Sequence, residues 1–105
     1  MSTIDDREKG FERKFANDQE MEFRASSRRN RMLAEWAGRL MGLESVDDYA
    51  KAVLRSHFEQ PGDEDVLRKV SKDLAGSGLA VSEDEVRGKM DELLAIARGQ
   101  IQAGE

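Results

Sequence analysis

A single proline in 105 residues constrains the fold of this chain most, because proline ends helices and interrupts strands. Pro61 is that residue, and charged and helix-favouring residues run from about Ile4 to Met41. The sequence has no run of alternating β-branched or aromatic residues. It also lacks the Asn-Gly and Asp-Gly pairs that most often turn a hairpin. These observations predict an all-α fold.

The first predicted helix, Ile4–Met41, is the longest. A continuous helix of this length spans about 57 Å at roughly 1.5 Å per residue, which exceeds what a small bundle needs. Gly42 is expected to end it. Apolar residues follow the spacing of a core-facing stripe only in its second half: Ala25, Met32, Leu33, Trp36, Ala37, Leu40 and Met41.

Capping residues predict three shorter helices after it. Ser45, with an acid three residues later, begins the second helix, which ends before Pro61. Asp63 is the expected cap of the third helix, and the glycines of residues 76–78 end it. Ser82 and the glutamate three residues later form a capping box for the fourth helix.

Each shorter helix carries one apolar stripe, and the short connections predict a small four-helix bundle. The stripe residues are Val46, Tyr49, Ala50, Val53, Leu54 and Phe58; Val66, Leu67, Val70 and Leu74; and Val86, Met90, Leu93, Leu94, Ala97 and Ile101. The first half of the long helix is left without a place in this core.

Composition argues against most enzymes and against metal or cofactor sites. Hydrophobic residues make up 38% of the chain and charged residues 37%, with no cysteine and a single histidine, His57. That histidine is expected to be an ordinary surface or boundary residue, and zinc would need more ligands than the chain offers. We therefore predict no enzyme activity, no cofactor and no metal.

Charge and hydropathy bear on location and partners. The first 42 residues carry a net charge of +1 and the rest −6, which argues against a nucleic-acid surface in the later part. No secretory signal and no apolar stretch of about 20 residues is present, so a cytoplasmic protein without membrane insertion is expected. The basic cluster Arg24–Arg31 is interpreted as a solvated helix face whose arginines pair with acids on other helices.

Two aromatic rings stand in the polar N-terminal segment. Ile4, Phe11 and Phe15 lie on one helical face, which becomes polar at Asp18 and Glu22. These rings either pack on the second helix or enter a groove in another protein. The length of the segment, its closely spaced charges and its thin apolar stripe favour the groove.

Three stretches of the chain resemble a known family. They are "DDREKGFERKFANDQEMEF", "RRNRMLAEWAGRLMG" and "PGDEDVLRKVSKDL", and their order and spacing are similar to those of the zeta subunit of α-proteobacterial F1Fo-ATP synthases. The resemblance runs the length of the chain. It implies a four-helix bundle with a mobile N-terminal segment, and an inhibitor in place of an enzyme.

The resemblance also implies a mechanism. Residues 1–17 would be an inhibitory segment that is flexible when free, and residues 18–105 the four-helix domain. The segment would insert into F1 at the catalytic interface of the α and β subunits, next to γ, and block rotation in the hydrolytic direction. The protein would be a monomer when free and peripheral at the inner membrane when bound. The implied contacts are Ile4, Asp6, Arg7, Glu8, Phe11, Glu12 and Phe15.

Two other functions stay open from the sequence. The chain could be a small helical adaptor or a nucleotide-binding protein whose pocket lies in the bundle, among the second to fourth helices. It could also bind nucleic acid through Arg24–Arg31, an alternative that the acidic remainder disfavours.

Overall fold

The computed structural model describes the backbone of residues 3–59 and 62–105, and the side chains of residues 18–55 and 62–105. It contains four helices: α1 (Thr3–Met41), α2 (Val46–Glu59), α3 (Asp63–Gly76) and α4 (Glu83–Gln102). No strand occurs among the residues so described. The predicted all-α four-helix fold with a long first helix is confirmed.

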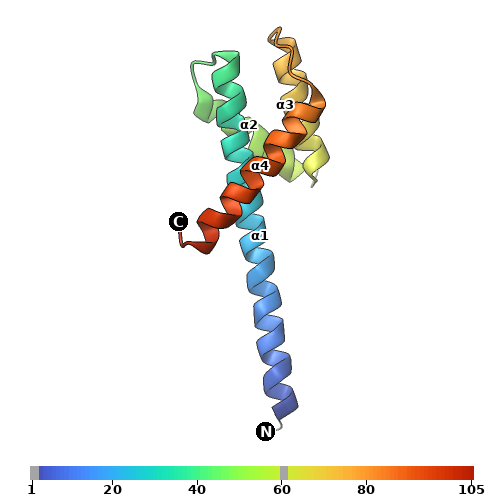
Figure 1. The fold of residues 1–105 in the computed structure, drawn as a ribbon, viewed down its shortest axis with the longest axis vertical. Coiled ribbons are helices and arrows are strands. Elements are labelled where there is room, and N and C mark those ends of the chain that lie inside the picture. Colours follow the sequence, from blue (N-terminus) through green and yellow to red (C-terminus); the bar gives the residue numbers. More distant parts are fainter. Residues whose placement is uncertain (1–2, 60–61) are drawn as a thin grey trace.

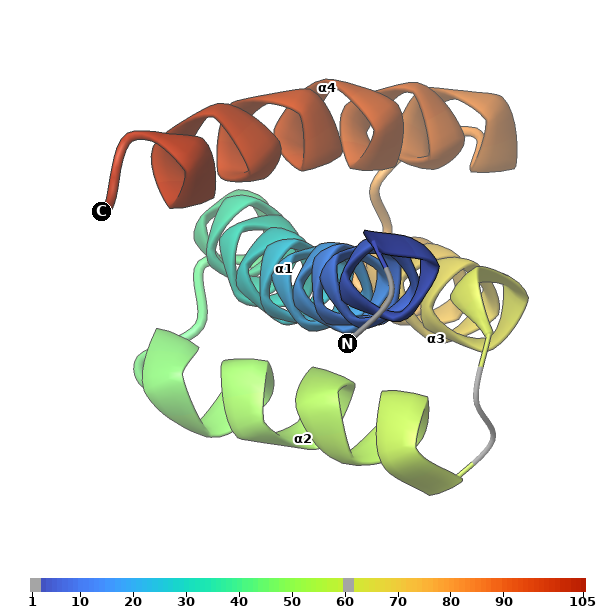
Figure 2. The ribbon, with the colours of Figure 1, turned by 90° about the horizontal axis from the view of Figure 1, so that it is seen from below.

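Helix α1 is the central element of the bundle. Seen along α1, α2 lies on one side of it and α4 on the other, with α3 alongside (Figure 2). The N-terminal half of α1 continues beyond the other three helices (Figure 1). The molecule is therefore elongated, with extents of 64 × 26 × 23 Å.

The core joins the predicted stripes of all four helices. Its buried hydrophobic residues are Leu33, Ala34, Ala37, Ala50, Val53, Val66, Leu67, Val70, Leu74, Val86, Met90 and Leu93. Trp36, Met32 and Met41 pack against this cluster while partly exposed. Leu40 was expected in the core, and that prediction is wrong: its side chain is 45% exposed, because it lines an open groove between α1 and α4. Phe58 lies outside the described side chains.

The helix ends follow the capping predictions with one exception. Gly42 has a φ of 68° and ends α1, while the Leu43 amide donates to the carbonyl of Gly38 (3.0 Å). Ser45 accepts a hydrogen bond from the amide of Asp48 (3.2 Å), and Ser82 caps α4 by accepting from the amide of Glu85 (3.1 Å).

Asp63 does not cap α3, and that prediction is wrong. Gly62 occupies the cap position, no side chain caps the helix there, and Asp63 is the first helical residue. Its carboxylate instead accepts a hydrogen bond from Arg29 of α1. The acid that was assigned to local structure therefore makes a contact between helices.

Candidate partner-binding arm and its base

The candidate site is the part of α1 that leaves the bundle, residues 3–17, called the arm below. Its backbone is helical and runs away from α2, α3 and α4 (Figure 1). The side chains of all seven predicted contacts lie outside the described residues: Ile4, Asp6, Arg7, Glu8, Phe11, Glu12 and Phe15. Because the backbone is helical, Ile4, Phe11 and Phe15 share one face by their spacing.

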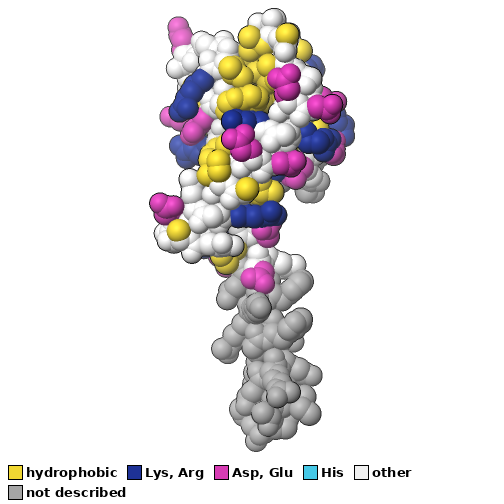
Figure 3. Space-filling model, in the orientation of Figure 1, with side chains coloured by type: hydrophobic (Ala, Val, Ile, Leu, Met, Phe, Trp, Pro, Cys, Tyr) yellow, Lys and Arg dark blue, Asp and Glu magenta, His cyan; other side chains and the backbone are white. Residues whose placement is uncertain are grey.

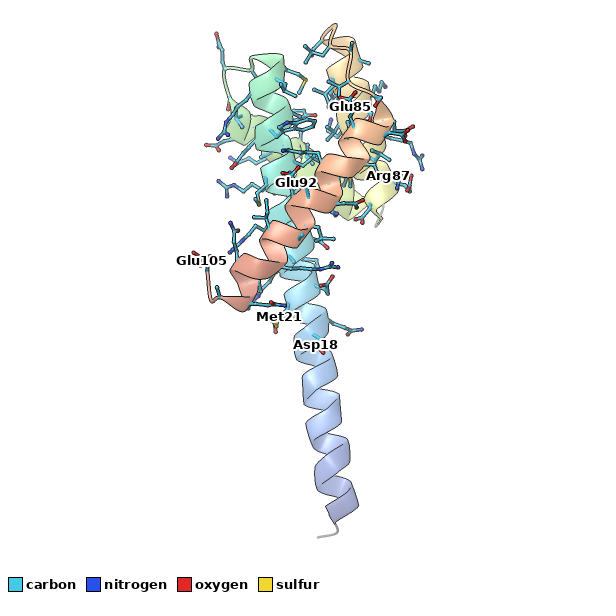
Figure 4. All side chains as sticks on the ribbon, viewed as in Figure 1. Asp18, Met21, Glu85, Arg87, Glu92 and Glu105 are labelled. Carbon is cyan, nitrogen blue, oxygen red and sulfur yellow. The ribbon has the colours of Figure 1, made fainter. Side chains whose placement is uncertain are left out.

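Packing against the bundle begins a few residues beyond the arm. Asp18, Gln19 and Glu20 are exposed, Met21 is half-buried, and Ala25 is the first fully buried side chain described in α1. Figure 4 shows Asp18 and Met21 at the level where α1 leaves the bundle. Tertiary contact with α1 therefore starts between Asp18 and Ala25 in the part of the chain whose side chains are described.

A bidentate ion pair joins α1 and α4 at this level. Arg98 Nε donates to Glu22 Oε1 (2.7 Å), and its second nitrogen donates to Oε2 (2.8 Å). The two side chains are about half exposed. The hydrogen bonds from Arg98 lower the pKa of the Glu22 carboxyl, and the same bonds raise the pKa of Arg98.

A second arginine extends this contact to the end of the chain. Arg28 donates to the main-chain oxygen of Glu105 (2.7 Å) and to the Gln100 side chain (3.3 Å). Phe23 and Ile101 line the hollow between these groups, which has a volume of about 390 Å³. We call Glu22, Arg28, Arg98, Gln100 and Glu105 the base clamp.

The arginines of the basic cluster Arg24–Arg31 form hydrogen bonds or ion pairs, but the prediction that all of them lie on a solvated face is wrong for one of them. Arg29 is 1% exposed and donates to Asp63 of α3 (2.6 Å) and to Asn30 (2.8 Å). Its neighbour Arg31 is exposed and pairs with Glu35 and Asp47. Arg29 stands four residues from both Ala25 and Leu33, so its position on the core stripe could have revealed its burial.

Comparison with known families identifies the chain. The family described as ATPase inhibitor subunit zeta matches residues 1–100, which includes both the arm and the bundle. The chain belongs to the ATPase inhibitor subunit zeta family. No curated protein matches it in the corresponding comparison. The predicted resemblance is confirmed, and the family description is that of an ATPase inhibitor subunit.

The zeta-family bundle also has an open groove between α1 and α4. It has a volume of about 410 Å³ and is lined by Met32, Glu35, Trp36, Arg39, Leu40, Lys89 and Leu93. The Lys89 ammonium lies 5.8 Å from the centre of the Trp36 ring, a cation–π contact. Figure 3 shows hydrophobic side chains gathered on this face of the molecule. The groove combines an aromatic wall with two cations and one acid.

The remaining chemistry of this zeta-family chain is sparse. No group of three potential metal ligands occurs in the described residues. Within the same residues, none of the helices combines the length and apolar character that crossing a membrane requires. The predicted surface histidine, His57, has its side chain outside the described residues.

Proposed function

We propose that this chain inhibits ATP hydrolysis by the F1 head of ATP synthase through its N-terminal segment, residues 1–17. The segment enters the catalytic interface of the α and β subunits next to γ and blocks rotation in the hydrolytic direction. The observation that carries the proposal is the continuation of α1 as a helix to Thr3, beyond the bundle (Figure 1). Membership in a family of ATPase inhibitor subunits supports it.

The dimensions of the molecule are consistent with an arm that enters a cleft and a bundle that stays outside it. A single helix with its side chains is about 10–12 Å in diameter. The molecule measures 26 × 23 Å perpendicular to its long axis. A cleft that admits the arm can therefore exclude the bundle. The protein acts from the cytoplasmic face, held at the inner membrane only through ATP synthase.

The arm offers one apolar face to such a cleft. Burying Ile4, Phe11 and Phe15 contributes about 1.5–3 kcal/mol each. Ordering a segment on binding costs about 2–5 kcal/mol, so the apolar anchors alone support moderate affinity. Asp6, Arg7, Glu8 and Glu12 supply charges of both signs next to that face. Complementary charges in the cleft then set the register and orientation of the helix.

Inhibition of cognate F1 tests the proposal directly. The full chain, and a peptide of residues 1–20, should each suppress ATP hydrolysis. The double variant Phe11→Ala with Phe15→Ala should fold normally and inhibit more weakly. Leu40→Ala is the matched control, because it removes an exposed apolar side chain from the other end of α1. Absence of inhibition by the full chain would refute the proposal.

The groove between α1 and α4 favours a second candidate function, nucleotide binding in the bundle. Trp36 provides a ring for stacking, and Arg39 and Lys89 provide positive charge at the groove. Titration of ATP while amide chemical shifts are followed should then perturb residues 32–40 and 89–93. Chemical-shift changes confined to other residues, or no changes at all, would contradict nucleotide binding in this groove.

A further inference from the structure

The outermost described hydrogen bonds between α1 and another helix lie at the base clamp. Glu22 is the residue nearest the arm that hydrogen-bonds to another helix among the described side chains, and its partner Arg98 is 76 positions away. Farther out, the ion pair of Glu20 among the described side chains is within α1, with Arg24 (2.7 Å). Figure 4 shows the end of α4, with Glu105 labelled, next to α1 at this level.

We propose that Arg98 is a positioning residue that keeps the residues joining the arm to the bundle helical and so strengthens inhibition. This inference rests on the proposed function of the arm. Arg98 acts through Glu22 of α1, to which it donates two hydrogen bonds. It does not need to touch F1.

The physical basis is the cost of starting a helix. Fixing the first turn is unfavourable, with a nucleation constant of about 10⁻³, whereas each added residue costs little. A helix already fixed at one end extends without a new nucleus. The arm needs this help, because Gly10 lies within it and costs about 1 kcal/mol relative to alanine. The buried residues Ala25 and Arg29 supply the fixed end, and the Glu22–Arg98 pair extends it outward by about one turn.

Loss of the clamp moves that fixed end inward by about one turn. The next supports are the buried residues Ala25 and Arg29, which hold α1 whether or not Glu22 is paired. The bundle should therefore stay folded, while the helix content of the arm falls. A less preorganised arm then loses more conformational entropy on binding and inhibits less strongly.

A closely similar ion pair elsewhere provides the control. Arg87 of α4 donates to both carboxylate oxygens of Glu64 in α3 (3.0 and 3.2 Å). The side chains of Arg87 and Glu64 are 51% and 58% exposed, and those of Arg98 and Glu22 are similarly 48% and 53% exposed. It joins two helices that do not carry the arm. Arg87→Gln thus removes comparable chemistry without touching α1.

The experiment compares Arg98→Gln, Arg87→Gln and the charge swap Glu22→Arg with Arg98→Glu, all in the full chain. The concentration that half-inhibits cognate F1 should rise about two- to fivefold for Arg98→Gln. Cα chemical shifts of residues 10–20 in the free chain should move toward coil values. The charge swap should recover both properties, and Arg87→Gln should change neither.

Several outcomes would overturn the clamp proposal. These are unchanged inhibition and unchanged shifts in Arg98→Gln, an equal loss in Arg87→Gln, or no recovery by the charge swap. If the wild-type chain does not inhibit F1, the proposed function fails instead. The chemical shifts of the free chain still decide whether the clamp controls the helix of the arm.

Discussion

The Arg29 guanidinium donates to the Asp63 carboxylate across 2.6 Å and thereby joins the middle of α1 to the first residue of α3. The arginine side chain is 2% exposed, whereas that of the aspartate is 58% exposed. The positive charge of Arg29 is thus buried, whereas the negative charge of Asp63 is partly solvated. Because a buried charge needs a partner, this bond should contribute more to stability than an ion pair between two exposed side chains.

Replacing Asp63 with alanine should lower the free energy of unfolding by about 2–3 kcal/mol, because Arg29 is left buried without its counter-charge. Denaturant unfolding followed by circular dichroism measures this change. Asp47→Ala is the control: Asp47 also lies in the first turn of its helix and faces an arginine of α1, but at 3.9 Å and 82% exposed. It should cost less than about 1 kcal/mol. Equal losses would contradict the role given to Arg29.

Acid should open the Glu22–Arg98 pair. Its hydrogen bonds lower the pKa of Glu22 below the ordinary value of 4.5. A lowered carboxyl pKa stabilises the folded state above the unfolded pKa, and this contribution is lost as pH falls through the folded value. A ¹³C titration of the side-chain carboxyl should give a midpoint below 4.5. In Arg98→Gln the midpoint should rise, and an unchanged midpoint would rule out the pair as the cause.

Alkali should act through Tyr49, which is the only tyrosine. Burial raises its pKa, and the hydrogen bond it donates to Asp73 (2.9 Å) raises it further. A raised pKa stabilises the folded state fully below the unfolded value of about 10, and the contribution declines as pH rises above it. Tyrosinate absorbance should therefore appear at higher pH in the folded chain than in denaturant. Coincident titrations would contradict the buried hydrogen bond.

Core truncation should separate the two classes of apolar residue. Leu74 is fully buried between the helices, so Leu74→Ala should cost about 2–5 kcal/mol of unfolding free energy. Ile96 is 42% exposed on α4, and Ile96→Ala should change stability by less than about 1 kcal/mol. Thermal unfolding of both variants measures the difference. A large loss in Ile96→Ala would show that its face is covered in solution.

Local pattern predicted the helices and most of the core because both depend on residues close together in sequence. The third helix shows this best, since Val66, Leu67, Val70 and Leu74 are all buried as expected. The prediction that Leu40 is buried failed because periodicity does not tell where the neighbouring helices stop covering an apolar stripe. The prediction that Arg29 is exposed failed because it rested on the charge of the side chain and not on its position in the stripe.

The candidate site divided in the same way. The spacing of Ile4, Phe11 and Phe15 predicted an apolar face, and the backbone of α1 has the helical form that such a face requires. The base clamp was missed. Its partners Glu22 and Arg98 are 76 positions apart, and no local spacing links them. Asp63 was assigned to a cap because its long-range partner could not be seen from its neighbours.

One uninterrupted helix, Thr3–Met41, belongs to both the arm and the bundle. The number of residues between them therefore fixes the angle at which the arm faces outward. Each residue turns an α-helix by about 100°, so inserting one alanine after Asp18 would rotate the face of Phe11 by that amount and lengthen the arm by about 1.5 Å. Four inserted residues would nearly restore the original direction. The number of residues between the bundle and Phe11 thus sets both how far the arm extends and in which direction its apolar face points.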